Sequence, residues 1–192
     1  MTAKNSRTVK ILGFSGSLRK GSFNKMLLNA AKELAPEEME IDIFDIDGIP
    51  LFNQDLENEP HDKLKIFKEK IKSSDGVLIV TPEYNFSIPG VLKNAIDAVS
   101  RPYGTNPFEE KPVGIMGAST GMLGTARAQY HLRQSLIFLN AYPMNKPEIL
   151  VPYAKDKFND SGKLTDEFTI KMVKEFLASL VKWVNRLKQK DI

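Results

Sequence analysis

A cluster of hydroxyl, amide and guanidinium donors fills residues 15–24, which directly follow a short apolar run. Gly16 and Gly21 allow main-chain N–H groups to point inward, and a helix that begins after Ser22 adds the positive end of its dipole. Arg19 can form two parallel hydrogen bonds to phosphate oxygens. Side-chain donors are also supplied by Ser15, Ser17, Ser22 and Asn24. This first loop therefore predicts a binding site for a dianionic phosphate.

Two common phosphate-binding loops are excluded by the spacing within the first loop. Gly16 and Gly21 have P-loop separation, but Ser22 replaces the required lysine and Phe23 the magnesium-binding Ser or Thr. The G-x-G-x-x-G dinucleotide fingerprint is absent because Gly13 and Gly16 are three residues apart. A tyrosine-phosphatase loop would need a cysteine. The remaining prediction is a terminal phosphomonoester bound without phosphoryl transfer, and the alternative is an ordinary Ser/Gly-rich loop that caps a helix.

A second candidate loop, residues 82–89, follows the most apolar run of the chain. Tyr84, Phe86 and Ile88 alternate there with carboxyl, amide and hydroxyl side chains, between two prolines. Aromatic rings and polar groups on a proline-stiffened loop suit a flat heterocycle with a polar edge. The alternative is that Tyr84 and Phe86 pack on the loop's own helix or on a partner subunit.

A third candidate loop, residues 117–124, has the sequence GASTGMLG. Its three glycines and small side chains permit close approach of the main chain to a ligand and leave N–H donors free. These donors could meet ring carbonyls or a ribityl chain. The alternative is a flexible turn between a strand and a helix.

The composition of the 192 residues excludes several other kinds of site. Without cysteine, the chain forms no disulfide, thiolate metal site, Cys-ligated iron–sulfur cluster or cysteine nucleophile. Two histidines cannot form a three-His metal centre, and we expect no metal site. The 27 Lys and Arg against 24 Asp and Glu give a net charge of +3. Because basic and aromatic residues do not cluster, nucleic-acid binding is not expected.

The distribution of apolar residues indicates a cytoplasmic protein. No run of about 18 apolar residues is present to span a membrane. The first ten residues, MTAKNSRTVK, are followed by no apolar segment of a signal peptide. We therefore expect no membrane partner.

Strand-like and helical patterns alternate along the chain and define the elements that must position the three loops. Apolar runs predict strands over residues 9–14, 40–46, 76–81, 111–118 and 148–151. Helical spacing of apolar residues follows each of the five. The alternation predicts an α/β domain over residues 1–192, with five parallel strands and helices on both faces. Ligands bind such sheets beyond the carboxyl ends of the strands, at the switch point of the winding, where all three loops are expected.

Two of the predicted helices have features of their own. The helix at 123–139 is apolar around much of its circumference, which predicts burial against another subunit. Its apolar and aromatic residues include Tyr130, Leu132, Leu136, Ile137 and Phe138. The last helix is expected to start near Thr165 as its N-cap, with Asp166 and Glu167 in the first turn.

The chain resembles the NADPH-dependent FMN reductase family, in the branch that contains chromate, quinone and azo-dye reductases. The likeness rests on residues 16–24 (GSLRKGSFN), 81–85 (TPEYN) and 88–97 (IPGVLKNAID), supported by 124–134 and 145–148. It implies a flavodoxin-like, doubly wound sheet of five parallel strands in the order 2-1-3-4-5, and a bound FMN. In this family the first loop holds the phosphate, the second lines the ribityl chain and isoalloxazine ring, and the third closes the other side. The FMN-binding residues that the resemblance implies are Ser15, Ser17, Leu18, Arg19, Ser22, Phe23, Asn24, Pro82, Glu83, Tyr84, Asn85, Ser119, Thr120, Gly121 and Gly124.

The resemblance also implies an activity, in which flavin N5 takes hydride from NADPH or NADH. Two electrons then pass to a small-molecule acceptor: a quinone, an azo compound, a metal oxyanion such as chromate, or free flavin. No catalytic side chain is required, and a homodimer or homotetramer through the 123–139 helix is expected. Arg19 and Arg101 are further candidates, either for stabilising the negative charge of reduced flavin or for contacting the NAD(P)H phosphates.

Two alternatives from other functional classes are considered. The first is a flavodoxin-type FMN electron carrier without a nicotinamide site. Such carriers are usually acidic, so the charge of +3 disfavours it. The second is a response-regulator-like signalling domain, which needs an acidic pocket after the first strand. Residues 12–15, Leu-Gly-Phe-Ser, supply none.

Overall fold

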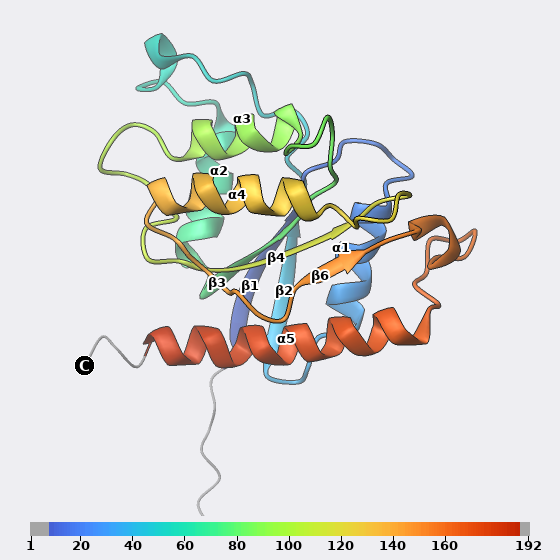
Figure 1. Ribbon diagram of the computed structural model, residues 1–192. Coiled ribbons are helices and arrows are strands. Elements are labelled where there is room, and N and C mark those ends of the chain that lie inside the picture. Colours follow the sequence, from blue (N-terminus) through green and yellow to red (C-terminus); the bar gives the residue numbers. More distant parts are fainter. Residues whose placement is uncertain (1–7, 189–192) are drawn as a thin grey trace, which may run out of the picture.

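A computed structural model describes residues 8–188, which form a six-stranded parallel sheet with helices on both faces (Figure 1). The strands are β1 (Val9–Ser15), β2 (Met39–Phe44), β3 (Gly76–Val80), β4 (Pro112–Ala118), β5 (Tyr142–Pro143) and β6 (Ile149–Val151). The helices are α1 (Phe23–Glu33), α2 (Asp62–Ser73), α3 (Gly90–Val99), α4 (Ala126–Phe138) and α5 (Glu167–Lys188). The strand order β2-β1-β3-β4-β5, with β6 beside β4, confirms the predicted flavodoxin-like topology. Residues 1–7, including the start at which no signal peptide was expected, and residues 189–192 lie outside the described residues.

The outer edge of the sheet differs from the prediction, because two short strands replace the single predicted fifth strand. β5 pairs with Pro112 and Val113 at the start of β4, and β6 pairs with the last three residues of β4. Pro143 and Pro147 lie in or between the two pieces, and neither has the N–H that a continuous ladder requires. The strand prediction for 148–151 therefore covered only the second piece.

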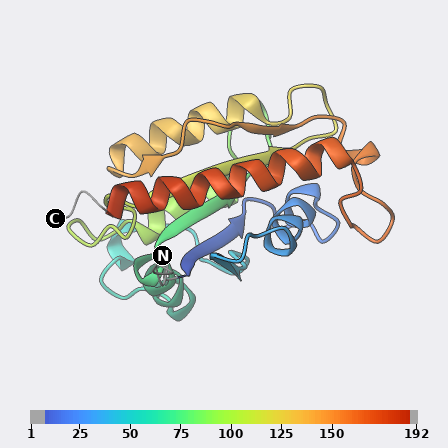
Figure 2. The ribbon, with the colours of Figure 1, turned by 90° about the horizontal axis from the view of Figure 1, so that it is seen from below.

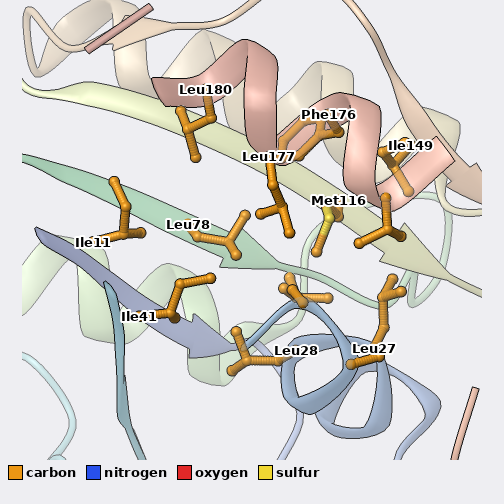
Figure 3. Close-up of a cluster of buried hydrophobic side chains, with 14 of the residues drawn as sticks. Ile11, Leu27, Leu28, Ile41, Leu78, Met116, Ile149, Phe176, Leu177 and Leu180 are labelled. Atoms are coloured by element: carbon orange, nitrogen blue, oxygen red, sulfur yellow. The ribbon is translucent and has the colours of Figure 1, made fainter. Parts of the chain in front are cut away.

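Side chains that alternate along the central strands build two cores, one on each face of the sheet. Ile11 and Leu78 face α1 and α5, and Figure 3 shows them with Leu27, Leu28, Phe176 and Leu177 in one cluster. Leu12 and Ile79 face α2, α3 and α4 on the other side. Figure 2 shows α1 and α5 together on the same face. The central strands are buried on both faces, which is why they appear in the sequence as continuous apolar runs.

The helix boundaries correct two predictions. α4 starts at Ala126 rather than near 123, because Gly124 and Thr125 have φ angles of 54° and 75°, which no right-handed helix accommodates. α5 starts at Glu167, and Asp166 rather than Thr165 caps it, since Asp166 Oδ1 accepts a 2.9 Å hydrogen bond from the Thr169 N–H. Among residues 8–188, no helix is both long and apolar enough to cross a membrane.

Candidate functional site

The first loop runs from the end of β1 into the first turn of α1, and its serines are buried although polar. Ser15, Ser17 and Ser22 are 6%, 2% and 2% exposed. Ser15 Oγ accepts a hydrogen bond from the Ser17 N–H (3.3 Å), and Ser17 Oγ accepts one from the Arg19 N–H (3.4 Å). Ser22 Oγ caps α1 by accepting from the Asn24 N–H at 3.2 Å. These local bonds fix the course of the main chain between strand and helix.

The charges and free donors of the first loop favour an anion from outside the chain. The first turn of α1 contains no acidic residue, although that position usually attracts one. The N–H groups of Phe23 and Lys25 make no hydrogen bond to any residue in the described range 8–188. Arg19 lies beside them, its guanidinium carbon 5.7 Å from the Phe23 ring centroid. Free N–H groups at a helix start, next to a guanidinium, form an anion site.

The Asn24 side chain joins the first loop to the third. Its Nδ2 donates to the Ala118 carbonyl at 2.9 Å, and its Oδ1 accepts from the Ala118 N–H at 2.9 Å. The residue is 3% exposed. The Asn24 amide therefore positions the two loops relative to each other, and its contact with the phosphate stays a prediction.

The second loop folds into a tight turn after β3. Tyr84 and Ser87 exchange main-chain hydrogen bonds of 3.0 and 2.9 Å. Between them Asn85 and Phe86 have φ angles of 50° and 64°, as the central residues of a type I′ turn require. Tyr84 and Phe86 are 50% and 65% exposed. The turn therefore presents both aromatic rings at the surface beyond β3.

Glu83, at the start of this turn, has its carboxylate on α4. Its Oε2 accepts from the N–H groups of Arg127 (3.0 Å) and Ala128 (3.2 Å), and Arg127 Nη1 donates to its Oε1 at 3.3 Å. The α4 N-cap residue, Thr125, supplies no side-chain cap of its own. Glu83 therefore caps a helix more than 40 residues away in sequence, a role that the predicted ring contact did not include.

The third loop is held against the segment that follows β6. The Ser119 N–H donates to the Val151 carbonyl (3.0 Å), and the Ser119 carbonyl accepts from the Ala154 N–H (2.9 Å). Ser119 Oγ donates to the Gly121 carbonyl at 3.1 Å. In contrast, the N–H groups of Thr120 and Gly121 make no hydrogen bond to the part of the chain that the structure describes. Both residues are exposed, so these N–H groups are available to a ligand.

The sheet brings the three loops to one edge, because β1, β3 and β4 are adjacent and parallel. Gly117 touches both neighbouring segments: a Cβ added there would lie 1.9 Å from Thr125 Oγ1 and 2.5 Å from the Thr81 carbonyl oxygen. Gly16 is similarly close to Leu92 of α3. The site therefore combines an anion-binding end with aromatic rings and free N–H groups, which suits a ligand with a terminal phosphate and a flat ring.

Comparison with known proteins decides which family this site belongs to. The sequence matches the model of the NADPH-dependent FMN reductase family over residues 9–156. The chain belongs to this family. Membership confirms the enzyme class predicted above, an NAD(P)H-dependent FMN reductase with FMN as cofactor and NAD(P)H as co-substrate.

Individual relatives of this FMN reductase cover nearly its whole length. An NAD(P)H-dependent FMN reductase of Pseudomonas aeruginosa is 48% identical over 186 residues, which is 95% of this chain and 99% of the relative. A 2-hydroxy-1,4-benzoquinone reductase of a Burkholderia species is 43% identical, covering 92% of this chain and 96% of the relative. Among solved structures, the flavoenzyme NAD(P)H:(acceptor) oxidoreductase of Paracoccus denitrificans superposes with a TM-score of 0.87 at 35% identity, covering 93% and 98% of the two chains.

The residues present at the three loops fit the FMN that this family uses. A dianionic phosphate matches the free N–H groups of Phe23 and Lys25 and the guanidinium of Arg19. A flat ring with carbonyl groups matches the exposed Tyr84 and the free N–H groups of the third loop. Every buried side-chain nitrogen and oxygen in the described chain already has a hydrogen-bond partner. The available ligand contacts are therefore main-chain N–H groups, exposed side chains, and the hydroxyl hydrogens of Ser17 and Ser22, whose oxygens act only as acceptors in the bonds above.

Arg101, a weaker candidate in this FMN reductase, does not join the three loops. It follows the C-terminal end of α3, and the polypeptide runs from there to the start of β4, at the opposite edge of the sheet (Figure 1). Its Nε donates to Glu57 Oε2 at 2.8 Å, and this hydrogen bond raises the pKa of Arg101. Its guanidinium carbon also lies 3.6 Å from the Tyr103 ring centroid. Arg101 therefore lies apart from the three loops, and its contact with the NAD(P)H phosphates stays a prediction.

Three residues that the sequence reasoning did not assign contribute to the site. The main chain of Ala118 is hydrogen-bonded to the Asn24 side chain, and Arg127 pairs with Glu83. The Tyr153 N–H donates to the Gly121 carbonyl at 3.2 Å. Ala118 acts through its main chain, which no residue type reveals. Arg127 stands within the family-like stretch 124–134, and that stretch was the available signal. Tyr153 has a φ of 48°, a conformation that its residue type does not predict.

Proposed function

We propose that this enzyme uses NAD(P)H to reduce quinones through FMN bound at the three loops. In this proposal the first loop binds the phosphate through the N–H groups at the start of α1, the Ser17 and Ser22 hydroxyls and the Arg19 guanidinium. The adjacency of a free helix N-terminus with exposed aromatic and amide groups carries the proposal. FMN, when bound, supplies hydride acceptance at N5 and delivery of two electrons.

The second and third loops would orient the ring of FMN. Tyr84 and Asn85 lie on a turn fixed by two main-chain hydrogen bonds, so their positions are set before a ligand arrives. The free N–H groups of Thr120 and Gly121 are suited to hydrogen bonding with ring carbonyls. Donors directed at the pyrimidine edge would stabilise the negative charge that builds up there on reduction. Pro82 and Gly124 would shape the site through their main chain.

The acceptor is proposed from the shape and chemistry of the surface around the loops. Tyr84, Phe86 and Met122 are 50%, 65% and 70% exposed, so the ring site has an open apolar rim. Such a rim suits flat molecules such as quinones, and the Burkholderia relative is named for a benzoquinone. Azo compounds, chromate and free flavin are further acceptors that an open site of this kind admits.

A homodimer or homotetramer through α4 is also proposed, with each copy a single domain over residues 1–192. Leu132 and Leu136 are fully buried in the chain's own core and take no part in an interface, contrary to the prediction. Tyr130, Ile137 and Phe138 are 55%, 73% and 79% exposed on the same helix. Three exposed large apolar residues on one helix are suited to burial against a second copy.

Purified protein tests the proposed function in two steps. The protein is expected to be yellow or to take up one FMN per chain, and anaerobic NADPH or NADH should bleach the flavin absorbance. Addition of 1,4-benzoquinone should restore it. A colourless protein that binds no FMN overturns the proposal. Bound flavin that both nucleotides leave oxidised supports the electron carrier instead.

A further inference from the structure

The second loop is attached to α4 by three side-chain contacts. Glu83 caps the helix through the N–H groups of Arg127 and Ala128. The Arg127 guanidinium carbon lies 3.7 Å from the Phe86 ring centroid, within stacking distance. Ser87 Oγ lies 2.9 Å from His131 Nδ1, one helical turn further along. The whole turn from 83 to 87 is therefore held from one side by one helix.

Phe86 needs such support more than any other residue of the turn. Its φ of 64° is in the left-handed region, where a side chain with a Cβ is disfavoured, and an aromatic residue is unusual there. Asn85, with a φ of 50°, is of a type that tolerates this region. Phe86 is also 65% exposed, so core packing does not hold it. Strained residues persist where their surroundings fix them, and the contact recorded for the Phe86 ring is with Arg127.

Arg127 connects this strained residue to the helix cap. One side chain pairs with Glu83 through Nη1 at 3.3 Å and lies over the Phe86 ring, so it contacts residues on both sides of Tyr84 and Asn85. The planar, five-donor guanidinium permits both contacts at once, whereas a lysine ammonium is a single point charge that can pair with the carboxylate or lie over the ring. Arg127 is 38% exposed on its side chain, and Glu83 is 13% exposed.

We propose that Arg127 is a positioning residue for the flavin: with Glu83 and Phe86 it forms a clamp that fixes Tyr84 and Asn85 before FMN binds. The inference rests on the proposed function, in which these two residues line the ring. Arg127 acts through the main chain of the turn, by holding Glu83 and Phe86 on either side of Tyr84 and Asn85.

Hydrogen exchange on the FMN-free protein tests the clamp directly. The Tyr84 N–H donates to the Ser87 carbonyl and the Ser87 N–H donates to the Tyr84 carbonyl, so the exchange of these two amides reports the opening of the turn. Arg127→Gln removes the guanidinium but keeps the main-chain bonds to Glu83. It should speed exchange in residues 82–89 about two- to five-fold, as expected for a lost cation–π contact. Arg133→Gln is the matched control on the same helix, because Arg133 instead contacts the Met144 carbonyl and Asn145.

The Phe86→Gly variant separates positioning from general stability. Glycine adopts a positive φ without support, so Arg127→Gln should have little further effect in that background. Arg127→Lys retains a charge that can lie over the Phe86 ring or pair with Glu83 but lacks the planar fork that does both, so its exchange should fall between those of wild type and Arg127→Gln. In FMN titrations, Arg127→Gln should weaken FMN binding and alter the visible circular dichroism of the bound flavin. The melting temperature of the Arg127→Gln protein should be close to that of Arg133→Gln.

The possible outcomes distinguish the clamp from the proposed function. The clamp is supported if Arg127→Gln exchanges faster than wild type in residues 82–89 and Arg133→Gln does not. In addition, Arg127→Gln should cause no further increase when it is combined with Phe86→Gly. Equal exchange in Arg127→Gln and wild type, with FMN bound by both, overturns the clamp and leaves the proposed function standing. A wild-type protein that binds no FMN overturns the proposed function and, with it, the flavin role of the clamp.

Discussion

The side-chain amide of Asn24 makes two hydrogen bonds, each 2.9 Å long, to the main chain of Ala118, 94 residues away. This pairing imitates one rung of a sheet, since the amide both donates to the carbonyl and accepts from the N–H. It joins the start of α1 to the last residue of β4. The phosphate end and the ring end of the proposed FMN site are therefore held at a fixed separation by one buried side chain.

Asn24→Ala is expected to lower the free energy of unfolding by about 2–4 kcal/mol, because it leaves a buried N–H and a buried carbonyl of Ala118 without partners. Urea denaturation of the FMN-free protein measures this loss. Asn29→Ala, an exposed asparagine on the same helix, is the control and should change stability by less than about 0.5 kcal/mol. Equal stability of the two variants would show that the Asn24 pair contributes nothing net.

Gly117→Ala is expected to be more damaging than its size suggests. The new Cβ would lie 1.9 Å from Thr125 Oγ1 and 2.5 Å from the Thr81 carbonyl, and both threonines are buried. Because the main chain must move, we expect the free energy of unfolding to fall by about 3 kcal/mol or more, as measured by thermal unfolding. Gly121→Ala in the same loop meets no atom within 4 Å and should keep wild-type stability. If Gly117→Ala and Gly121→Ala unfold with the same stability, Gly117 does not lie as close to Thr81 and Thr125 as the structure places it.

Most of the fold could be predicted because its signals are local. Buried parallel strands such as β3 are continuous apolar runs, and the helices between them repeat their apolar residues at helical spacing. The start of α4 could not be predicted, because Thr125 is an ordinary residue that only tertiary contacts hold at a φ of 75°. The division of the outer strand into β5 and β6 follows from Pro143 and Pro147, which lack the N–H groups that a continuous ladder needs.

The location of the site could be predicted better than the roles of its side chains. The three loops were expected at one edge, and the order of the strands places them there. The partners of Asn24 and Glu83 lie 94 and 44 residues away, a separation at which no spacing rule applies. Both side chains are predicted FMN contacts, and the structure shows that both bind the main chain of another element. The residue types indicate that Asn24 and Glu83 form hydrogen bonds, but only the fold determines which groups are their partners.

Arg19→Ala should weaken FMN binding about tenfold or more, because a charge-assisted contact to the phosphate is lost. Riboflavin, which lacks the phosphate, should bind wild type and variant equally. Fluorescence titration with both flavins measures the difference, and Lys20→Ala, its exposed neighbour, should have a smaller effect. A parallel fall in FMN and riboflavin affinity would place Arg19 at the ring, and unchanged FMN affinity would remove it from the phosphate site.

Asp166 gives the stability of the protein a specific dependence on acid pH. Hydrogen bonds from Thr169 and Lys157 lower the pKa of Asp166 from 3.8 to about 2. The folded state therefore binds fewer protons than the unfolded state between these values, so the contribution of Asp166 is complete above pH 4 and is lost as the pH falls toward 2. Asp166→Asn keeps an oxygen that can cap α5 but removes the charge.

The stability difference between wild type and Asp166→Asn should be greatest at neutral pH and should shrink between pH 4 and 2. Urea unfolding at steps from pH 7 to 2.5 measures this difference. Asp160→Asn, on an exposed turn, is the control, and its difference from wild type should not follow this course. A difference for Asp166→Asn that stays constant across the whole series would mean that the geometry of the cap, and not its charge, stabilises the start of α5.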